Sequence, residues 1–261
     1  MLWQLKQDIC EFGRRLWQLG FVAANDGNIS ARCDEDRVLA TPTGVSKGFM
    51  EPGMLIVCDM QGELLAGDRA PSSELAMHLE IYRLRPDVRA VVHAHPPVAT
   101  AFAAAGVALD KCALPESVLS LGAIPVAPYG TPSTEEIPAS IRPFVPRCDA
   151  VLLANHGAVC WADSLEGAYF RMETLEHTAR ITMHALQLGG VQPLSAADVE
   201  KLQAVRAKMG LRGRVLPCEV AGTCPVLSAE AEASARRPQA EPELVALVER
   251  VARDVLARLK E

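Results

Sequence analysis

The sequence predicts a soluble α/β protein built around one main domain. Amphipathic stretches with helical spacing alternate along the chain with short apolar runs of strand length. Of its 261 residues, 49% are hydrophobic and 22% are charged, as is usual for a soluble globular chain. The length suits one large domain with an appendage, or two small domains.

Charge, hydropathy and cysteine content exclude several classes of function. The net charge of -6 and the pI near 5.6 argue against a nucleic-acid surface. No apolar run approaches the ~20 residues that cross a bilayer, and the N-terminus lacks a signal-peptide pattern, so a cytoplasmic location is expected. The eight cysteines are scattered without a Cys-x-x-Cys pair, which favours reduced thiols over a disulfide framework. Cys218 and Cys224 remain a less favoured metal-binding pair.

In the first part of the chain, the pattern predicts a helix, several short strands and a second helix. Residues 2–19 have apolar side chains at helical spacing, and Gly20 follows as a C′ glycine. The second helix should open at Pro71–Glu74, where a serine occupies the N-cap position. Strands are expected after Gly27 and at 38–40, 55–59 and 61–65, the last two forming a hairpin.

In the second part of the chain, helices and strands continue to alternate. Asp163–Glu166 has the form of a capping box, Gly189-Gly190 should end the helix that it starts, and Ser195 should cap the next. Residues 107–131 read as mostly irregular. Strands are expected at 90–95, 124–127 and 151–154, and helices at 97–104, 134–141, 163–188 and 195–209.

A candidate metal site begins at His93 and His95, which follow a short apolar run. Residues i and i+2 of a strand point to the same face, so both imidazoles can reach one ion. Glu74 lies 19 residues before His93, and His156 follows another apolar run. Three histidines and a carboxylate suit Zn²⁺ and leave a labile position, although the same ligands accept Mn²⁺ or Co²⁺. The other histidines are expected to be packed or on the surface: His78, His177 and His184.

Three polar loops accompany these ligands, at 25–32, 41–48 and 71–74. Their glycines, hydroxyls and backbone N–H groups suit a phosphate group, although each loop alone could be a plain turn. Together with the metal site they favour carbon–carbon chemistry on a small phosphorylated sugar. Metal-activated hydrolysis and a purely structural zinc site remain alternatives.

Five motifs follow one another along the chain: Gly27–Ser30, Thr41–Gly44, Pro71–Glu74, His93–His95 and Asn155–Gly157. In this order they resemble the class II aldolase family of L-fuculose-phosphate aldolase and ribulose-phosphate 4-epimerase. The resemblance covers about residues 1–215 and implies a three-layer α/β/α fold with a central, mainly antiparallel sheet. It also implies a cyclic homotetramer with sites between subunits.

The resemblance also assigns roles to residues. It implies Zn²⁺ on His93, His95 and His156, with Glu74 as fourth ligand and as the catalytic acid/base. The implied reaction cleaves a ketose 1-phosphate like L-fuculose 1-phosphate to dihydroxyacetone phosphate and an aldehyde such as lactaldehyde. The matching phosphate-binding positions are Asn28, Thr43, Gly44, Ser72 and Ser73.

The chain departs from the aldolase pattern at two tyrosines. Residues 112–121, which correspond to the segment that donates a tyrosine across the subunit boundary, contain none, and Met209 matches the second tyrosine. Glu116 is a candidate replacement as second acid/base. Its segment, Leu114–Glu116, resembles that of family members that decarboxylate an oxo-tetronate phosphate, so decarboxylation is an alternative to aldol cleavage. A further alternative is 4-epimerisation, which other members of the family perform. A non-catalytic binding domain is disfavoured, because relatives of that kind have lost metal ligands that this chain retains.

The C-terminal part of the chain lies beyond the resemblance. Residues 216–242 are interpreted as a linker, because 228–242 carry no large apolar side chain. Residues 243–261 form an amphipathic helix pattern that must dock on its own body, a sister subunit or a partner. The pattern resembles the encapsulation peptides that carry enzymes into bacterial microcompartments, which implies shell proteins as partners of 243–260.

Overall fold

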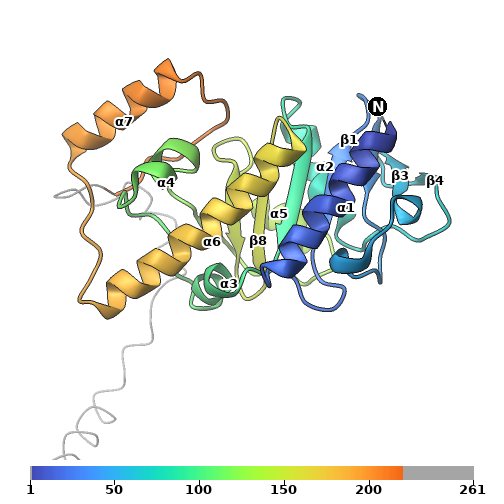
Figure 1. Cartoon of the computed structure of the whole chain (residues 1–261), viewed down its shortest axis with the longest axis horizontal. Coiled ribbons are helices and arrows are strands. Elements are labelled where there is room, and N and C mark those ends of the chain that lie inside the picture. Colours follow the sequence, from blue (N-terminus) through green and yellow to red (C-terminus); the bar gives the residue numbers. More distant parts are fainter. Residues whose placement is uncertain (1, 220–261) are drawn as a thin grey trace, which may run out of the picture. The chain divides into compact units, whose positions relative to one another are not determined.

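A single mainly antiparallel sheet organises the computed structural model, which describes residues 2–219 (Figure 1). The predicted tail helix and most of the predicted linker lie outside the described residues. The eight strands run in the order β4-β3-β2-β1-β5-β8-β7-β6, and only β6 and β7 are parallel neighbours. The strands are β1 Asn28–Arg32, β2 Arg37–Ala40, β3 Ile56–Asp59, β4 Leu64–Ala66, β5 Ala90–Ala94, β6 Val126–Ala127, β7 Ala150–Leu153 and β8 Gly157–Ala162.

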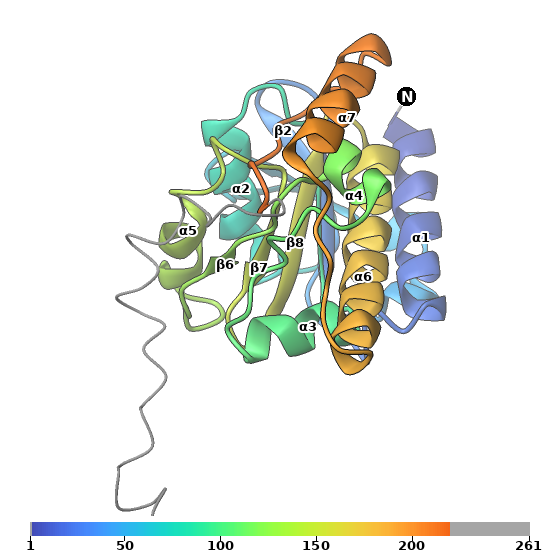
Figure 2. The same ribbon diagram turned by 90° about the vertical axis from the view of Figure 1, so that its left-hand side faces the viewer.

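Helices cover both faces of this sheet, so the predicted three-layer α/β/α arrangement is confirmed (Figure 2). On one side are α1 (Leu2–Gln18), α3 (Pro97–Ala104) and α6 (Leu165–Gln187), while α4 (Pro115–Ser120) packs on α6 and α7 (Ala196–Lys208) packs on α4. On the other side are α2 (Leu75–Leu84) and α5 (Glu136–Ile141). Two 3-10 turns, η1 (Lys47–Phe49) and η2 (Pro52–Met54), pack on α1. No helix within the described range is long and apolar enough to cross a membrane.

Strand alternation determines which layer each side chain joins. In β5, Val92 and Ala94 pack in the core under α1, α3 and α6, whereas Val91 packs on the opposite face with α2. His93 lies two residues after Val91 and therefore faces the α2 layer as well. This places a histidine of the central strand on the same side as the start of α2, which carries Glu74.

Several helix ends follow the sequence signals. Gly20 adopts φ +70° just past α1, as a C′ glycine should. Ser164 and Ser195 cap α6 and α7 by accepting hydrogen bonds from backbone N–H groups. The predicted capping box at α6 is wrong, because Gly167 occupies the position that the box requires for a glutamate.

Three other predictions need correction. Helix α2 begins at Leu75 and its N-cap is Glu74, so no serine caps it. The segment expected to be irregular contains α4, whose six residues are too few to show a helical repeat. The cysteines are not all reduced: Cys112 forms a disulfide with Cys218, which fixes the segment that follows buried Leu216.

Candidate functional site

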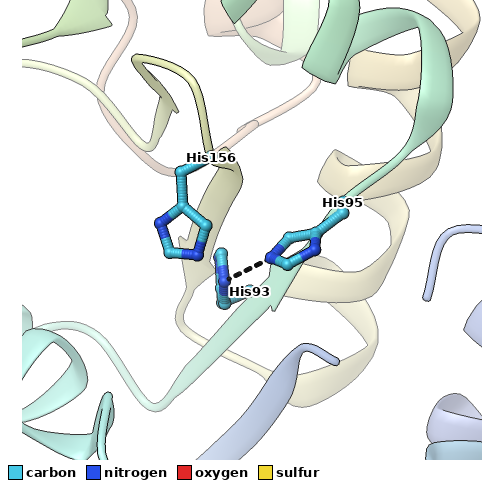
Figure 3. Close-up of side chains that lie close together, drawn as sticks. All are labelled: His93, His95 and His156. Carbon is cyan, nitrogen blue, oxygen red and sulfur yellow. Dashed lines mark hydrogen bonds between the residues drawn. The ribbon is translucent and has the colours of Figure 1, made fainter. Parts of the chain in front are cut away.

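The three predicted histidines converge at the end of β5 (Figure 3). His93 comes from β5 itself, His95 from the segment after it, and His156 from the turn between β7 and β8. The Nε2 atoms of His93 and His95 lie 3.2 Å apart, and one ring nitrogen of each histidine lies within 4.8 Å of the other two. The sequence prediction of a histidine group is therefore confirmed in geometry, and its role in binding a metal is considered below.

Tight packing around Gly157 brings the histidines together. Asn155 adopts φ +57° and turns the chain back from β7 into β8. A Cβ atom on Gly157 would lie 2.6 Å from both the Ala94 carbonyl oxygen and a ring carbon of His95, so only glycine fits. The Ala158 carbonyl, next in β8, lies 2.9 Å from Nδ1 of buried His93.

Glu74 closes the group on the α2 side. Its Oε2 atom lies 3.3 Å from Nε2 of His93, and its Oε1 atom lies 3.1 Å from Nε2 of His156. Asn28, the first residue of β1, donates a hydrogen bond of 2.8 Å from Nδ2 to Glu74 Oε2. The α2 N-cap thus aims a carboxylate at the same point as the histidines.

The electrostatic environment favours a neutral His95 and an ionised Glu74. Burial and the neighbouring histidines lower the pKa of His95 to about 4. Burial by itself would raise the pKa of Glu74, but His93 and His156 outweigh it and hold that pKa well below its usual range. Neutral imidazole and carboxylate are the forms that bind metal ions.

The hydrogen bonds among these side chains leave acceptor atoms without donors. A bound cation explains such acceptors better than a hydrogen-bond network that is complete in itself. Because Nδ1 of His93 donates to the Ala158 carbonyl, its Nε2 atom is left with a lone pair. Oε1 of Glu74 is buried yet has no hydrogen-bond partner, since the nearby His156 nitrogen is not aligned to donate. Acceptor atoms of His93 and Glu74 therefore lie 3.3 Å apart, an arrangement that a bound divalent metal ion would stabilise. His93, His95, His156 and Glu74 are the residues that would hold it.

The predicted phosphate loops meet beside this group. An isolated β-bridge joins Pro42 to Pro71, and Thr43 N–H donates to the Ala70 carbonyl. Asn28 Nδ2 also lies 3.4 Å from Ser72 Oγ. The structure therefore brings together the stretches that carry all five predicted residues: Asn28 is buried, Ser72 half-buried, and Thr43, Gly44 and Ser73 exposed.

Glu116, His177 and His184 lie on helices outside the histidine group. Glu116 is exposed on the first turn of α4, a helix that packs on α6 and α7. Its role as second acid/base stays a prediction. His177 and His184 are exposed on α6, as expected.

Two residues near the site carried no recognisable signal in the sequence. Asp26 Oδ2 lies 3.6 Å from Nδ1 of His95, just beyond hydrogen-bond distance. Lys47 is buried and donates to backbone carbonyls of two loops. Both contacts join loops that are distant in sequence, and no local spacing rule predicts them.

His78 belongs to a buried network under the site, as the prediction of a packed histidine implied. Its Nδ1 atom lies 2.7 Å from Ser30 Oγ, which in turn lies 2.9 Å from the hydroxyl of Tyr82. Burial, together with nearby His93, lowers the pKa of His78 to about 3. The ring is therefore neutral in the folded protein at every pH at which the protein would normally be handled.

This neutral histidine predicts a loss of stability in mild acid. The folded-state pKa lies below the unfolded value of ~6.5, so the unfolded chain binds an extra proton between about pH 6.5 and 3. His78 should therefore lower the free energy of unfolding by about 1–2 kcal/mol between pH 6.5 and 5. Urea unfolding of chelator-treated wild type and His78→Asn at both pH values measures this difference. An equal pH dependence in the two proteins would contradict it.

Known proteins are similar to this chain in sequence and in fold. A 3-oxo-tetronate 4-phosphate decarboxylase of Haemophilus influenzae is 34% identical over 202 residues, which are 76% of this chain and 95% of that protein. A 5-deoxy-D-ribulose 1-phosphate aldolase of Bacillus thuringiensis is 32% identical over 77% of this chain and 95% of its own length. The crystal structure of YgbL from Klebsiella pneumoniae matches with a TM-score of 0.72 and 33% identity, covering 77% of this chain and 99% of that one.

The family match spans the sheet and the histidine group. Residues 7–183 match the model of the class II aldolase and adducin N-terminal domain, and this range includes Glu74, His93, His95 and His156. The antiparallel sheet, the layers on both its faces and the convergent histidines agree with that match. The chain therefore belongs to the class II aldolase and adducin N-terminal domain family.

Proposed function

We propose that this chain is a zinc-dependent lyase that decarboxylates a 3-oxo-tetronate 4-phosphate. The observation that carries the proposal is that, among the acidic side chains of residues 2–219, only Glu74 lies against the Nε2 atoms of His93 and His156, whereas Asp26 lies 3.6 Å from Nδ1 of His95. Decarboxylation of a β-keto acid needs one proton donor, whereas aldol cleavage needs a second group to take the hydroxyl proton. All three tyrosines of the chain lie outside the aldolase positions, at Tyr82, Tyr129 and Tyr169.

The relatives support decarboxylation as the first candidate and aldol cleavage as the second. The decarboxylase from Haemophilus influenzae shares 34% identity, and the one from Cupriavidus necator shares 35% over 184 residues. The aldolase reading, which the sequence resemblance placed first, becomes the second candidate. It is favoured by the 32% identity to the Bacillus thuringiensis aldolase, whose named substrate is also a phosphorylated ketose.

Zinc is the proposed metal because three imidazoles and a carboxylate are ligands that it favours, and three of the separations between donor atoms fit a tetrahedral zinc site. Zn–N bonds of about 2.0–2.1 Å in a tetrahedron place ligand atoms about 3.3 Å apart. The measured separations are 3.2 Å between Nε2 of His93 and His95, 3.3 Å from His93 to Glu74 and 3.1 Å from His156 to Glu74. When bound, the metal supplies Lewis acidity next to the keto oxygen of the substrate.

In the proposed reaction, the bond between C1 and C2 of the β-keto acid breaks. C1 leaves as CO₂, and the electron pair remains on C2 and is delocalised to the oxygen on C3. The carboxyl group of Glu74 then gives a proton to C2, which yields dihydroxyacetone phosphate, and regains a proton from solvent. Once the substrate displaces Glu74 from the histidines, burial remains to raise its pKa, and the carboxyl group becomes a better acid.

Asn28 links the substrate phosphate to this carboxylate. Its side-chain amide donates to Glu74 Oε2 at 2.8 Å and lies 3.4 Å from Ser72 Oγ. In the proposal, Asn28, Thr43, Gly44, Ser72 and Ser73 bind the phosphate. This holds the reacting carbons over the histidines, since a fixed phosphate restricts the rest of a four-carbon substrate.

A comparison of substrates tests the proposal. The metal-loaded protein is incubated separately with 3-oxo-tetronate 4-phosphate, 5-deoxy-D-ribulose 1-phosphate and L-fuculose 1-phosphate, and dihydroxyacetone phosphate is followed by a coupled NADH assay. We expect the highest kcat/KM for the oxo-tetronate phosphate, with one CO₂ released per product. A higher kcat/KM for either ketose 1-phosphate would make aldol cleavage the function. Heat-inactivated protein controls for spontaneous decarboxylation.

We further propose a homotetramer and a docking role for residues 243–260, with microcompartment shell proteins as the partner. The apolar stripe of the sequence includes Val251, whereas Arg253 falls on the opposite face of a helix. Val251→Glu, like deletion of 228–261, should leave kcat/KM unchanged and abolish co-purification with co-expressed shell proteins, while Arg253→Glu should not. Co-purification of the truncated protein with shell would contradict the proposal.

A further inference from the structure

Lys47 is a buried lysine next to the proposed phosphate loops. It begins η1, three residues after Gly44, and is only 2% exposed. Helix α1 packs closely against it: a Cβ atom added to Gly13 of this helix would lie 3.0 Å from the Lys47 carbonyl oxygen. The lysine is therefore almost completely shielded from solvent.

The ammonium group joins two loops. Its Nζ atom donates to the Asn25 carbonyl at 2.6 Å and to the Val45 carbonyl at 2.7 Å. Asn25 opens the turn that leads to Asn28, and Val45 directly follows Gly44. A single charged group therefore fixes the separation between the two loops, and charge-assisted hydrogen bonds of this kind are stronger than neutral ones.

No carboxylate within residues 2–219 forms an ion pair with this ammonium group. The two acidic side chains near enough to affect it are Asp26 and Glu74, and both lie against histidines instead. Burial lowers the pKa of Lys47 to about 8, so most molecules still carry the charge at neutral pH. A buried charge is costly without a counter-charge, and a phosphate held by the adjoining loops would supply one.

We infer that Lys47 is a positioning residue that joins the two phosphate-binding loops and places a positive charge behind the substrate phosphate. The inference rests on the proposed function, since it requires the loops at Asn28 and Gly44 to bind phosphate. The ammonium group also binds two carbonyl oxygens whose negative ends would otherwise oppose an anion. Lys47 thereby favours a phosphorylated substrate over its unphosphorylated analogue.

Lys47→Met tests this inference in the full-length, metal-loaded protein. The expected result is a KM for the phosphorylated substrate that rises about ten- to a hundredfold, with a smaller change in kcat. Lys47→Gln retains a donor without the charge and should give an intermediate KM, and it carries the test if Lys47→Met does not fold. Met50→Ala is the matched control: Met50 is buried against Gly13 in the same packing layer, and its loss should lower Tm with KM unchanged.

Inorganic phosphate provides a readout that does not depend on turnover. Phosphate should raise the Tm of wild type and of Met50→Ala, because it binds the folded state, and should raise the Tm of Lys47→Met much less. An equal shift in Lys47→Met would overturn the inference about Lys47 but not the proposal that the loops bind phosphate. No shift in wild type would contradict phosphate binding by the loops, and the inference about Lys47 with it. An unchanged KM in both Lys47 variants would also contradict it.

Discussion

Glu74→Gln is expected to lower kcat by about 10²- to 10⁴-fold while metal stays bound. The glutamine has the shape of the glutamate and can still lie 3.1–3.3 Å from the histidines, but it cannot give a proton to C2. The three histidines remain to hold the metal. Steady-state kinetics with the preferred substrate, together with metal analysis of the same preparation, measures both parts of the prediction.

Glu116→Gln is the matched control for this variant, because it makes the same chemical change on an exposed helix. We expect its kcat to stay close to that of wild type if decarboxylation needs only Glu74. A loss as large as that of Glu74→Gln would assign Glu116 the second acid/base role. Such a role would favour aldol cleavage.

His93→Ala is expected to abolish metal binding and activity together. His93 is fully buried, and its Nε2 atom lies within 3.3 Å of donor atoms from both His95 and Glu74. Its removal leaves two histidines and a carboxylate and opens a cavity among them. The loss of activity should be at least as large as for Glu74→Gln, since metal electrostatics is usually the larger contribution to such chemistry.

Metal analysis after dialysis and the same kinetic assay test the His93 variant. His177→Ala is its control, because His177 is exposed on α6 and should retain both metal and activity. A His93→Ala protein that kept one metal ion per chain would contradict the ligand assignment. Circular dichroism shows whether the variant is folded, which separates loss of the ligand from loss of the structure.

The sequence predicted the histidine group because its signals are local. His93 and His95 are two residues apart after an apolar run, a spacing that predicts one shared face, and the two rings do meet although β5 ends at Ala94. His156 and Glu74 follow similar local patterns, at a strand end and at a helix start. The alternation of apolar runs with helical repeats likewise predicted α1, α6 and the β3–β4 hairpin close to their observed bounds.

The features that the sequence did not predict depend on contacts between distant segments. The Cys112–Cys218 disulfide joins residues 106 positions apart, and cysteine spacing does not determine such a pairing. No local pattern predicts the burial of Lys47, because that burial depends on α1, which is distant in sequence and packs against it. The start of α2 was misplaced because a serine of Pro71–Glu74 offered a plausible cap, whereas the Ser72 hydroxyl accepts from Glu74 N–H at 3.3 Å and from Asn28 Nδ2 at 3.4 Å.

Metal reconstitution tests the central claim, which is that the three histidines and Glu74 form a metal-dependent centre for carbon–carbon bond cleavage. Chelator-stripped protein is titrated with Zn²⁺, and dihydroxyacetone phosphate formation from 3-oxo-tetronate 4-phosphate is followed at each step. We predict no product without metal and activity that rises in proportion to bound zinc, with saturation at one ion per chain. Full activity in the stripped protein would contradict the claim.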